Sequence, residues 1–358
     1  MSGDPITQVT EELTYPAFNP AFVPVQLDPN TVHIRIGPWT GPVYTLSDAD
    51  GDAQLARLVE QLDGEQHVET ILESFDEDDR VSIASLLVDL HEKDVVLDQS
   101  QADPRYAHMP LRRRFANRER RRLEELDVLV VNSGTMGAQI ATDLREFGVG
   151  EVAALQPVAS ASDSRIEACA DEMFDPEALE AAVSGADFVV YAGDRPRPQL
   201  TDTINRVAHE TKTAWSSVQI HGFDGIVGPT VFPGETACYR CFEKRQLSNV
   251  VNNVGYERYA EYVDDAADAV QARVPGFSRL LAGYLVLDLA NVLPFGTGYT
   301  AGRVFVVDGI HLSVECNDVL KYPRCEVCGK PRGESVSQFI TVDDIRDAGN
   351  WVGTEGRK

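Results

Sequence analysis

Two pairs of cysteines carry the most specific chemistry in this sequence of 358 residues. Cys238 and Cys241 form one C-x-x-C pair, and Cys325 and Cys328 form another. Two such pairs can place four thiolates around one ion, and four sulfur ligands without an open position are typical of structural zinc. The pairs lie farther apart in the chain than those of a small zinc finger. We therefore predict a structural zinc ion that clips two distant segments of one domain.

The remaining two cysteines, Cys169 and Cys316, have no partner by spacing. We expect each to be a buried apolar residue rather than a nucleophile. Disulfides do not fit a chain that we expect in the cytoplasm, and a thioredoxin-like redox site would hold a single pair. The cysteine pattern therefore indicates metal binding, and we assign no catalytic residue.

A small-residue turn within residues 127–157 is the second candidate site. Four apolar residues, Val128 to Val131, predict a buried strand before it, and an amphipathic helix that ends at glycine follows it. Val152–Leu155 reads as the next strand. Such a βαβ unit opens a doubly wound α/β domain, and its first turn can present amide N–H groups to phosphate. The turn is made of Ser133, Gly134, Thr135 and Gly137.

Further elements must position these sites. Residues 187–194 read as a buried strand with Asp194 at its carboxyl end, where open α/β sheets collect ligands. A helix around 202–209, a strand over 214–220 and a glycine-broken hairpin over 221–229 follow. Two helical patterns span 256–273 and 277–292. The apolar face of the second suits a domain core or a homodimer seam equally well, and it consists of Leu280, Leu281, Tyr284, Leu285, Leu287 and Leu289.

The first hundred residues predict a separate module. Residues 1–30 read as an extended arm, and residues 31–100 as a small α+β module of winged-helix-like outline. Its expected elements are a hairpin (32–36 and 41–46), three helices (55–62, 68–75 and 81–90) and a closing strand (95–97). An Arg-rich linker helix (101–124), the main α/β domain (125–335) and a tail (336–358) complete the expected organisation.

Charge restricts the partners of the chain. Its net charge is −25, with 57 acidic against 32 basic residues and only six lysines. Acids spread along the chain, with arginine in place of lysine, are typical of a halophile's surface, and they argue against nucleic-acid or membrane binding. Eight arginines between Arg105 and Arg122 break this pattern, either as a linker that pairs with an acidic surface or as an anion site. With no long uncharged apolar window and no basic-then-apolar leader, we expect a soluble cytoplasmic protein.

The order of motifs resembles one superfamily. The glycine turn, the strand VVYAGD, the run GxxGPxxxPGxxxCYRC and the ending YPRCEVCG resemble ThiF-like proteins, the relatives of ubiquitin-activating enzymes, over about residues 30–335. The resemblance is closest to the ThiF-like partner proteins of YcaO cyclodehydratases, which form azoline rings in ribosomal peptides. The runs LVEQLDGEQHVETILESF and HEKDVVLD resemble a PqqD-like RiPP recognition element. Such modules bind a leader peptide as an added strand at the hairpin edge; a structural cap or a nucleic-acid binder are the alternatives.

The sequence departs from the adenylating members of that superfamily. Asn132 and Thr135 stand where the family has glycine, and Gln156 and Val158 where it has acids. No lysine occurs between Lys93 and Lys212, so the family's phosphate-binding lysine is absent there. The resemblance therefore implies a degenerate nucleotide site and does not favour ATP and Mg²⁺ as cofactors. Its residues would be Asn132, Gly134, Thr135, Gly137, Gln156, Arg165 and Asp194.

The favoured hypothesis is a non-catalytic, homodimeric partner of a YcaO enzyme that captures a precursor leader peptide. The rival is an adenylyltransferase that activates a sulfur carrier or a peptide C-terminal carboxylate, with Asp194 on magnesium and arginines in place of lysine. A third class, an NAD-dependent or redox enzyme, rests on the Rossmann-like turn alone, and Gln156 in place of a ribose-binding acid weakens it.

Overall fold

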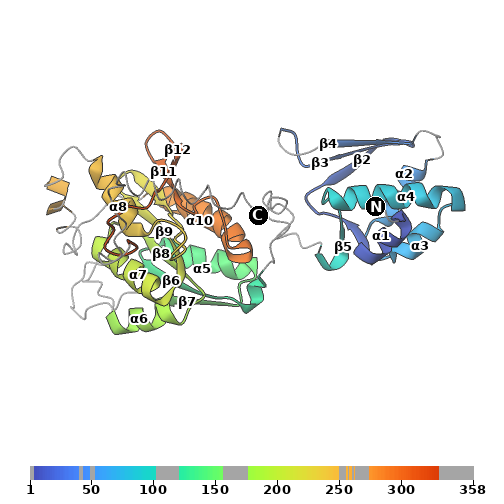
Figure 1. Cartoon of the computed structure of the whole chain (residues 1–358). Coiled ribbons are helices and arrows are strands. Elements are labelled where there is room, and N and C mark those ends of the chain that lie inside the picture. Colours follow the sequence, from blue (N-terminus) through green and yellow to red (C-terminus); the bar gives the residue numbers. More distant parts are fainter. Residues whose placement is uncertain are drawn as a thin grey trace, which may run out of the picture. The chain divides into compact units, whose positions relative to one another are not determined.

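The computed structural model describes residues 4–39, 43–48, 53–101, 121–155, 176–249, 255–256, 258–259, 262 and 274–329. The chain divides into two compact units, Met1–Ala116 (unit 1) and Asn117–Lys358 (unit 2) (Figure 1). Gln156, Arg165 and Cys169, most of the Arg-rich segment and of the predicted helix 256–273, and the tail 336–358 lie outside the described residues. The domain boundaries expected from the sequence stay a prediction.

Unit 1 is a small antiparallel sheet packed on helices. Its sheet has the order β2-β3-β4, and a separate two-stranded sheet joins β1 to β5. The central strand β3 turns Val32 and Ile34, both fully buried, onto the helices. The strands are β1 (Pro16–Phe18), β2 (Val23–Asp28), β3 (Thr31–Arg35), β4 (Val43–Ser47) and β5 (Val96–Asp98). The helices are α1 (Pro5–Glu12), α2 (Gln54–Gln61), α3 (Val68–Glu73), α4 (Glu77–Glu92) and the 3₁₀ turn Gln99–Gln101.

The structure contains the predicted hairpin, three helices and closing strand of this unit. The prediction that residues 1–30 form an extended arm is wrong. Residues 5–28 form α1, β1 and β2 instead. Asp4 caps α1, Pro5 opens it, and Val9 and Leu13 are buried one turn apart in the core of the unit. β2 then covers the edge of β3 that the hairpin prediction left open, and β5 pairs with β1 rather than with the hairpin.

Unit 2 is built on a seven-stranded mixed sheet of order β12-β11-β10-β9-β8-β6-β7. β7, β6, β8 and β9 run parallel, and β9 to β12 are antiparallel neighbours. β6 and β8 are buried on both faces, which explains their continuous apolar sequence. The strands are β6 (Asp127–Ser133), β7 (Glu151–Leu155), β8 (Phe188–Gly193), β9 (Ala214–His221), β10 (Asp224–Val227), β11 (Arg303–Asp308) and β12 (Ser313–Asp318). Each of the strands predicted in this region is confirmed.

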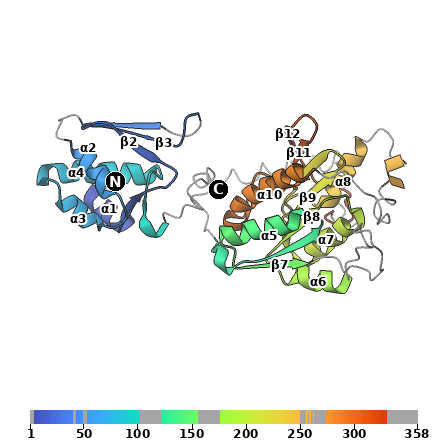
Figure 2. The ribbon, with the colours of Figure 1, turned by 180° about the vertical axis from the view of Figure 1, so that it is seen from behind.

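Helices cover the sheet of unit 2 (Figures 1 and 2). α6 (Pro176–Ser184), α7 (Pro198–Thr211) and α8 (Tyr239–Ser248) contribute to the core that includes Leu129, Val131 and Trp215. α5 (Met136–Phe147) ends at Gly148, whose φ of 98° is left-handed, as the sequence predicted. α5 packs on α10 (Pro275–Phe295), which lies against β9 and β10. The 3₁₀ turn Leu123–Glu125 precedes β6.

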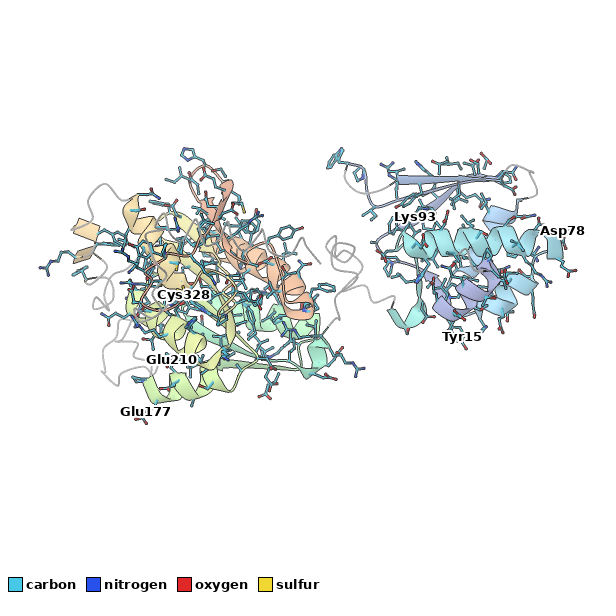
Figure 3. All side chains as sticks on the ribbon, in the orientation of Figure 1. Tyr15, Asp78, Lys93, Glu177, Glu210 and Cys328 are labelled. Atoms are coloured by element: carbon cyan, nitrogen blue, oxygen red, sulfur yellow. The ribbon has the colours of Figure 1, made fainter. Side chains whose placement is uncertain are left out.

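Two features of unit 2 differ from expectation. Cys316 lies on β12, all of whose residues are exposed, so the prediction that it is buried is wrong. A strand at the edge of a sheet has no second neighbour to bury it. Among the described residues, α10 is the one helix long and apolar enough to cross a membrane, although half of its apolar window is buried in the unit. Acidic side chains such as Asp78, Glu177 and Glu210 are exposed (Figure 3).

Candidate functional site

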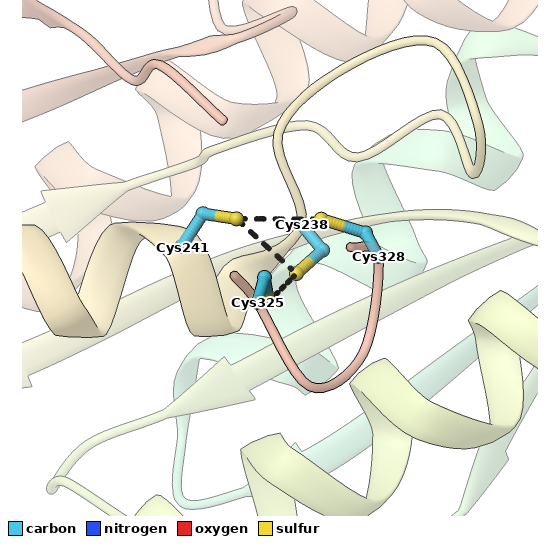
Figure 4. A group of neighbouring side chains, drawn as sticks. All are labelled: Cys238, Cys241, Cys325 and Cys328. Atoms are coloured by element: carbon cyan, nitrogen blue, oxygen red, sulfur yellow. Dashed lines mark hydrogen bonds between the residues drawn. The ribbon is translucent and has the colours of Figure 1, made fainter. Parts of the chain in front are cut away.

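The four paired cysteines converge as predicted. Cys238 caps α8 and Cys241 lies in its first turn, while Cys325 and Cys328 come from the segment after β12 (Figure 4). All four Sγ atoms lie within 4.8 Å of one another, and Cys238 Sγ is 3.5 Å from Cys325 Sγ. A tetrahedral zinc with Zn–S bonds of about 2.3 Å separates its sulfurs by about 3.8 Å. The donor set therefore fits one four-coordinate metal with no open position.

The thiols of the cluster share protons unequally. Hydrogen bonds from Cys238 and Cys241 lower the pKa of Cys328 to about 3, whereas hydrogen bonds with Cys241 and Cys328 raise the pKa of Cys238. The cluster thus favours at least one thiolate, the form in which cysteine binds metal. Cys325 is buried and Cys328 is half-buried, which limits access of solvent to the sulfurs.

Ion pairs tie the two cysteine segments together outside the sulfurs. The carboxylate of Glu326 accepts hydrogen bonds from Arg240 Nε, at 2.8 Å, and from Lys244 Nζ. The backbone N–H of Tyr322 donates to Cys241 Sγ at 3.2 Å. The segment 322–328 is therefore held on α8 by ion pairs and by a backbone hydrogen bond, as a clip between distant segments requires.

The glycine turn brings five of the predicted nucleotide residues together, but in an unexpected arrangement. The carboxylate of Asp194 accepts hydrogen bonds from Thr135 N at 2.9 Å, from Thr135 Oγ1 at 2.7 Å and from Met136 N at 3.4 Å. Asn132 Oδ1 accepts from Gly137 N at 3.1 Å. The amides that such a turn offers to phosphate are thus bound by the protein's own side chains.

Close packing keeps these side chains in place. Gly134 has φ +139°, and a Cβ atom there would lie 2.4 Å from Asp194 Cγ. A Cβ at Gly137 would lie 2.5 Å from Asn132 Oδ1. Both glycines therefore make room for Asp194 and Asn132 within the chain. Gln156 and Arg165, the other two predicted residues, lie outside the described residues.

A cavity of about 280 Å³ lies at the carboxyl ends of β8 and β9, beginning two residues beyond Asp194. Burial lowers the pKa of His221 to about 4, so this side chain is neutral near pH 7. Burial raises the pKa of Glu243 to about 7, although Arg240 lies 3.1 Å away. Gln219 Nε2 donates to Tyr239 Oη at 2.7 Å. The cavity can therefore hold a small polar group beside the guanidinium groups of Arg197 and Arg240.

Sequence reasoning missed this cavity. Gln219 lies at the end of the predicted strand 214–220 and His221 directly follows it. The carboxyl-end rule that singled out Asp194 therefore applied to both residues. Tyr239 and Glu243 had no such signal, because only the fold of α8 brings them to the sheet edge.

Comparison with known proteins agrees with the α/β fold of the chain. Residues 152–327 match the model of the ThiF family, and the sequence matches none of the curated proteins. The fold is similar to that of the heterocyclase TruD, with 19% identity, 88% of this chain covered and a TM-score of 0.60. It is also similar to MccB of E. coli, solved with ATP, with 13% identity, 88% of this chain covered and a TM-score of 0.59. MccB in complex with N-formylated MccA gives 13% identity, the same coverage and a TM-score of 0.58.

The two similar structures differ in length. This chain covers 99% of MccB but only 43% of TruD, so it spans less than half of the heterocyclase. At these identities the likeness concerns the fold, an α/β domain of ThiF type with a mixed sheet.

Proposed function

We propose that this chain is a non-catalytic, cytoplasmic partner of a YcaO cyclodehydratase in the biosynthesis of azoline-containing ribosomal peptides. Unit 1 captures the precursor's leader peptide, unit 2 docks the enzyme, and zinc holds the C-terminal part of unit 2 together. The observation that carries the absence of catalysis is the occupation of the turn amides by Asp194 and Asn132.

Electrostatics supports this proposal. A nucleotide phosphate at the N-terminus of α5 would have to displace the Asp194 carboxylate, or approach it as a second anion. Magnesium binding would in turn need this carboxylate to release the amides of Thr135 and Met136. The sequence supplies no lysine between Lys93 and Lys212 to balance the phosphates. Nucleotide turnover would thus require a rearranged loop and also a positive charge that this stretch of the chain does not supply.

The comparisons support a role in peptide modification. TruD is a heterocyclase, and MccB has been solved with the peptide MccA. This chain spans 43% of TruD, and in our proposal the heterocyclase activity itself belongs to the YcaO enzyme.

Unit 1 offers an open strand for a leader peptide. β3 is paired on both sides, so β4 is the open edge of the predicted hairpin among the described strands. Asp48 N donates to Asn30 O, and donors alternate along an antiparallel strand, so the N–H groups of Thr45 and Ser47 point away from β3. An extended peptide can pair with these groups by β-augmentation.

A second candidate, an adenylyltransferase, is favoured by one observation. This chain covers nearly the full length of MccB, which has been solved with ATP. In that case Asp194 would leave the turn to bind magnesium, and arginines would replace the family lysine.

Calorimetric titration of MgATP into the metal-loaded protein at high salt separates these functions, with MccB as the positive control. We expect no heat of binding and no ATP–pyrophosphate exchange. Tight binding that is lost in Asp194→Ala would overturn the proposal in favour of the adenylyltransferase. The positive half of the proposal predicts a YcaO gene and a short Cys/Ser/Thr-rich open reading frame beside the gene of this protein. Copurification of the YcaO protein and binding of the encoded peptide test it.

A further inference from the structure

A second cavity of unit 2 lies between α5 and α10. It measures about 550 Å³ and is lined by the first two turns of each helix, from Thr135 to Thr142 and from Pro275 to Ala282. The two helices pack against each other (Figure 1). Apolar residues, among them Met136 and Ala282, form part of the wall. Cavities of this size hold small organic molecules, and the polar side chains around them decide which molecule fits.

Ser278 carries the first sign of a ligand. Its side chain is only 4% exposed and lines the cavity, yet its hydroxyl has no hydrogen-bond partner in the part of the chain that the structure describes. Buried hydroxyls normally have a partner, because an unpaired polar group away from water costs free energy. A serine hydroxyl can both donate and accept. It is therefore available to a molecule in the cavity.

The α10 side of the cavity favours an anion. Arg279 is exposed, lines the cavity and makes no ion pair with any residue that the structure describes. α10 begins at Pro275, and the side chain of Val274 before it makes no capping hydrogen bond. The positive end of this helix dipole is thus not offset by the chain, and a guanidinium binds a carboxylate through two parallel hydrogen bonds. A carboxylate beside Ser278 and Arg279 would meet donors of both residues.

The α5 side of the cavity presents hydrogen-bond acceptors. Thr142 Oγ1 donates to the carbonyl oxygen of Ala138 at 3.0 Å, and Gln139 Nε2 donates to Asp143 Oδ1 at 2.7 Å. The hydroxyl proton of Thr142 is therefore used, while its lone pairs and the amide oxygen of Gln139 remain as acceptors. A ligand group on this side must supply the N–H or O–H donors.

Charge divides the cavity in the same way. Asp143 lies beside Gln139, and the carboxylate of Asp194 binds Thr135 at the N-terminus of α5, where it offsets the positive end of that helix dipole. The α5 side therefore lies next to two carboxylates, whereas the α10 side has a guanidinium and an uncapped helix. A molecule that carries a carboxylate at one end and an ammonium group at the other matches both sides.

We infer that the cavity between α5 and α10 binds a small amino carboxylate, a free amino acid or a short peptide. Its carboxylate accepts hydrogen bonds from Ser278 and Arg279, and its ammonium group donates to Gln139 and Thr142. The apolar wall of the cavity contacts the side chain of the ligand. The inference does not depend on the proposed function, because it uses neither the amides of the glycine turn nor any residue of unit 1.

Ligand-observed NMR with the metal-loaded full chain at high salt tests the inference. The probes are the proteinogenic L-amino acids, one at a time, and glycylglycine as the peptide. We expect at least one probe to bind. Its C-terminal amide, which lacks the carboxylate, and its N-acetyl derivative, which lacks the ammonium group, should each bind about tenfold more weakly or less.

Two arginines give a matched pair of variants. Arg279 and Arg324 are both exposed and make no ion pair among the described residues, but only Arg279 lines the cavity. Arg279→Gln should weaken binding about tenfold, and Arg324→Gln should leave it within about twofold. Ser278→Ala should weaken it about threefold or more. Equal melting temperatures without ligand establish that the variants fold, and Arg279→Gln decides the matter alone if Ser278→Ala does not fold.

The source of the ligand follows from the probes. Binding of a free amino acid assigns the cavity to amino acids, and binding of glycylglycine alone assigns it to peptides. Binding of no probe, binding that survives Arg279→Gln, or equal binding of the amide and N-acetyl derivatives would each overturn the inference. Inorganic phosphate that binds where the amino carboxylates do not would overturn it as well, in favour of a simple oxyanion site.

Discussion

The carboxylate of Asp194 binds both the backbone N–H and the hydroxyl of Thr135, a residue 59 positions earlier in the chain. This contact joins the carboxyl end of β8 to the N-terminus of α5, where the positive end of the helix dipole stabilises an anion. In a phosphate-binding turn the anion comes from the ligand; here the chain supplies it. The same residue that the sequence suggested as a magnesium ligand therefore serves as an internal cap.

Removal of this cap should lower the stability of the protein, and we expect no effect on ATP binding. Asp194 is buried, so Asp194→Ala leaves two amides and a hydroxyl without their acceptor, and we expect a loss of about 2–3 kcal/mol in the free energy of unfolding. Asp143→Ala, on the exposed side of α5, is the control and should change it by less than about 0.5 kcal/mol. Urea denaturation in the absence of nucleotide measures the free energy of unfolding of both variants. Equal stability of the two variants would contradict the role of Asp194 as an internal cap.

The metal site gives a prediction with an internal control. The purified protein should contain one metal ion per chain, and Cys238→Ser should lose it, because three sulfurs cannot close the tetrahedral site. Cys316→Ser should keep the metal, since Cys316 is exposed on β12 and outside the cluster. Elemental analysis measures the ion and identifies it. We expect Cys238→Ser or a strong chelator to lower the melting temperature of unit 2, because residues 325–328 would be released from α8. Metal retained in Cys238→Ser would contradict a four-sulfur site.

The sequence predicted those parts of the molecule whose signals are local. Each C-x-x-C pair, the β6 strand and the glycine that ends α5 are set by residues within one element, and the structure confirms them. The position of the Asp194 carboxylate depends on how β8 lies beside β6, which no spacing in the sequence encodes. Similarly, α1 was missed because its buried residues, Val9 and Leu13, stand among polar ones in a short helix. The prediction that Cys316 is buried was wrong because the order of the strands, and not the residue type, places β12 at the edge of the sheet.

Asp98 should make the stability of unit 1 sensitive to acid. Burial alone would raise its pKa, but hydrogen bonds from Ser100 and from the N–H groups of Tyr15 and Thr14 outweigh burial and lower it to about 2. A carboxyl whose pKa falls on folding stabilises the protein above its unfolded value of 3.8, and this stabilisation is lost as the pH falls towards 2.

Asp98→Asn isolates this contribution. We expect it to lower the free energy of unfolding by about 1 kcal/mol at pH 6, a value reduced for the solvent exposure of Asp98. The difference from wild type should shrink between pH 4 and pH 2, where the wild-type carboxyl becomes protonated as well. Denaturant titrations at several pH values measure the difference in the free energy of unfolding between wild type and Asp98→Asn. A difference that stays constant between pH 4 and pH 2 would exclude the Asp98 carboxylate as its source.

The open edge of β4 gives the sharpest test of peptide capture. Thr45→Pro removes an N–H group that points away from β3, so it should leave the ladder to β3 intact while it removes one bond to an added strand. Thr45→Val keeps the N–H and is the matched control. With a fluorescently labelled candidate precursor peptide, we expect Thr45→Pro to weaken binding about tenfold and Thr45→Val to leave it within about twofold. Circular dichroism establishes that both variants fold. Equal affinity of the two folded variants would place the peptide elsewhere on unit 1, and loss of binding in both would assign the effect to the threonine side chain rather than to the strand edge.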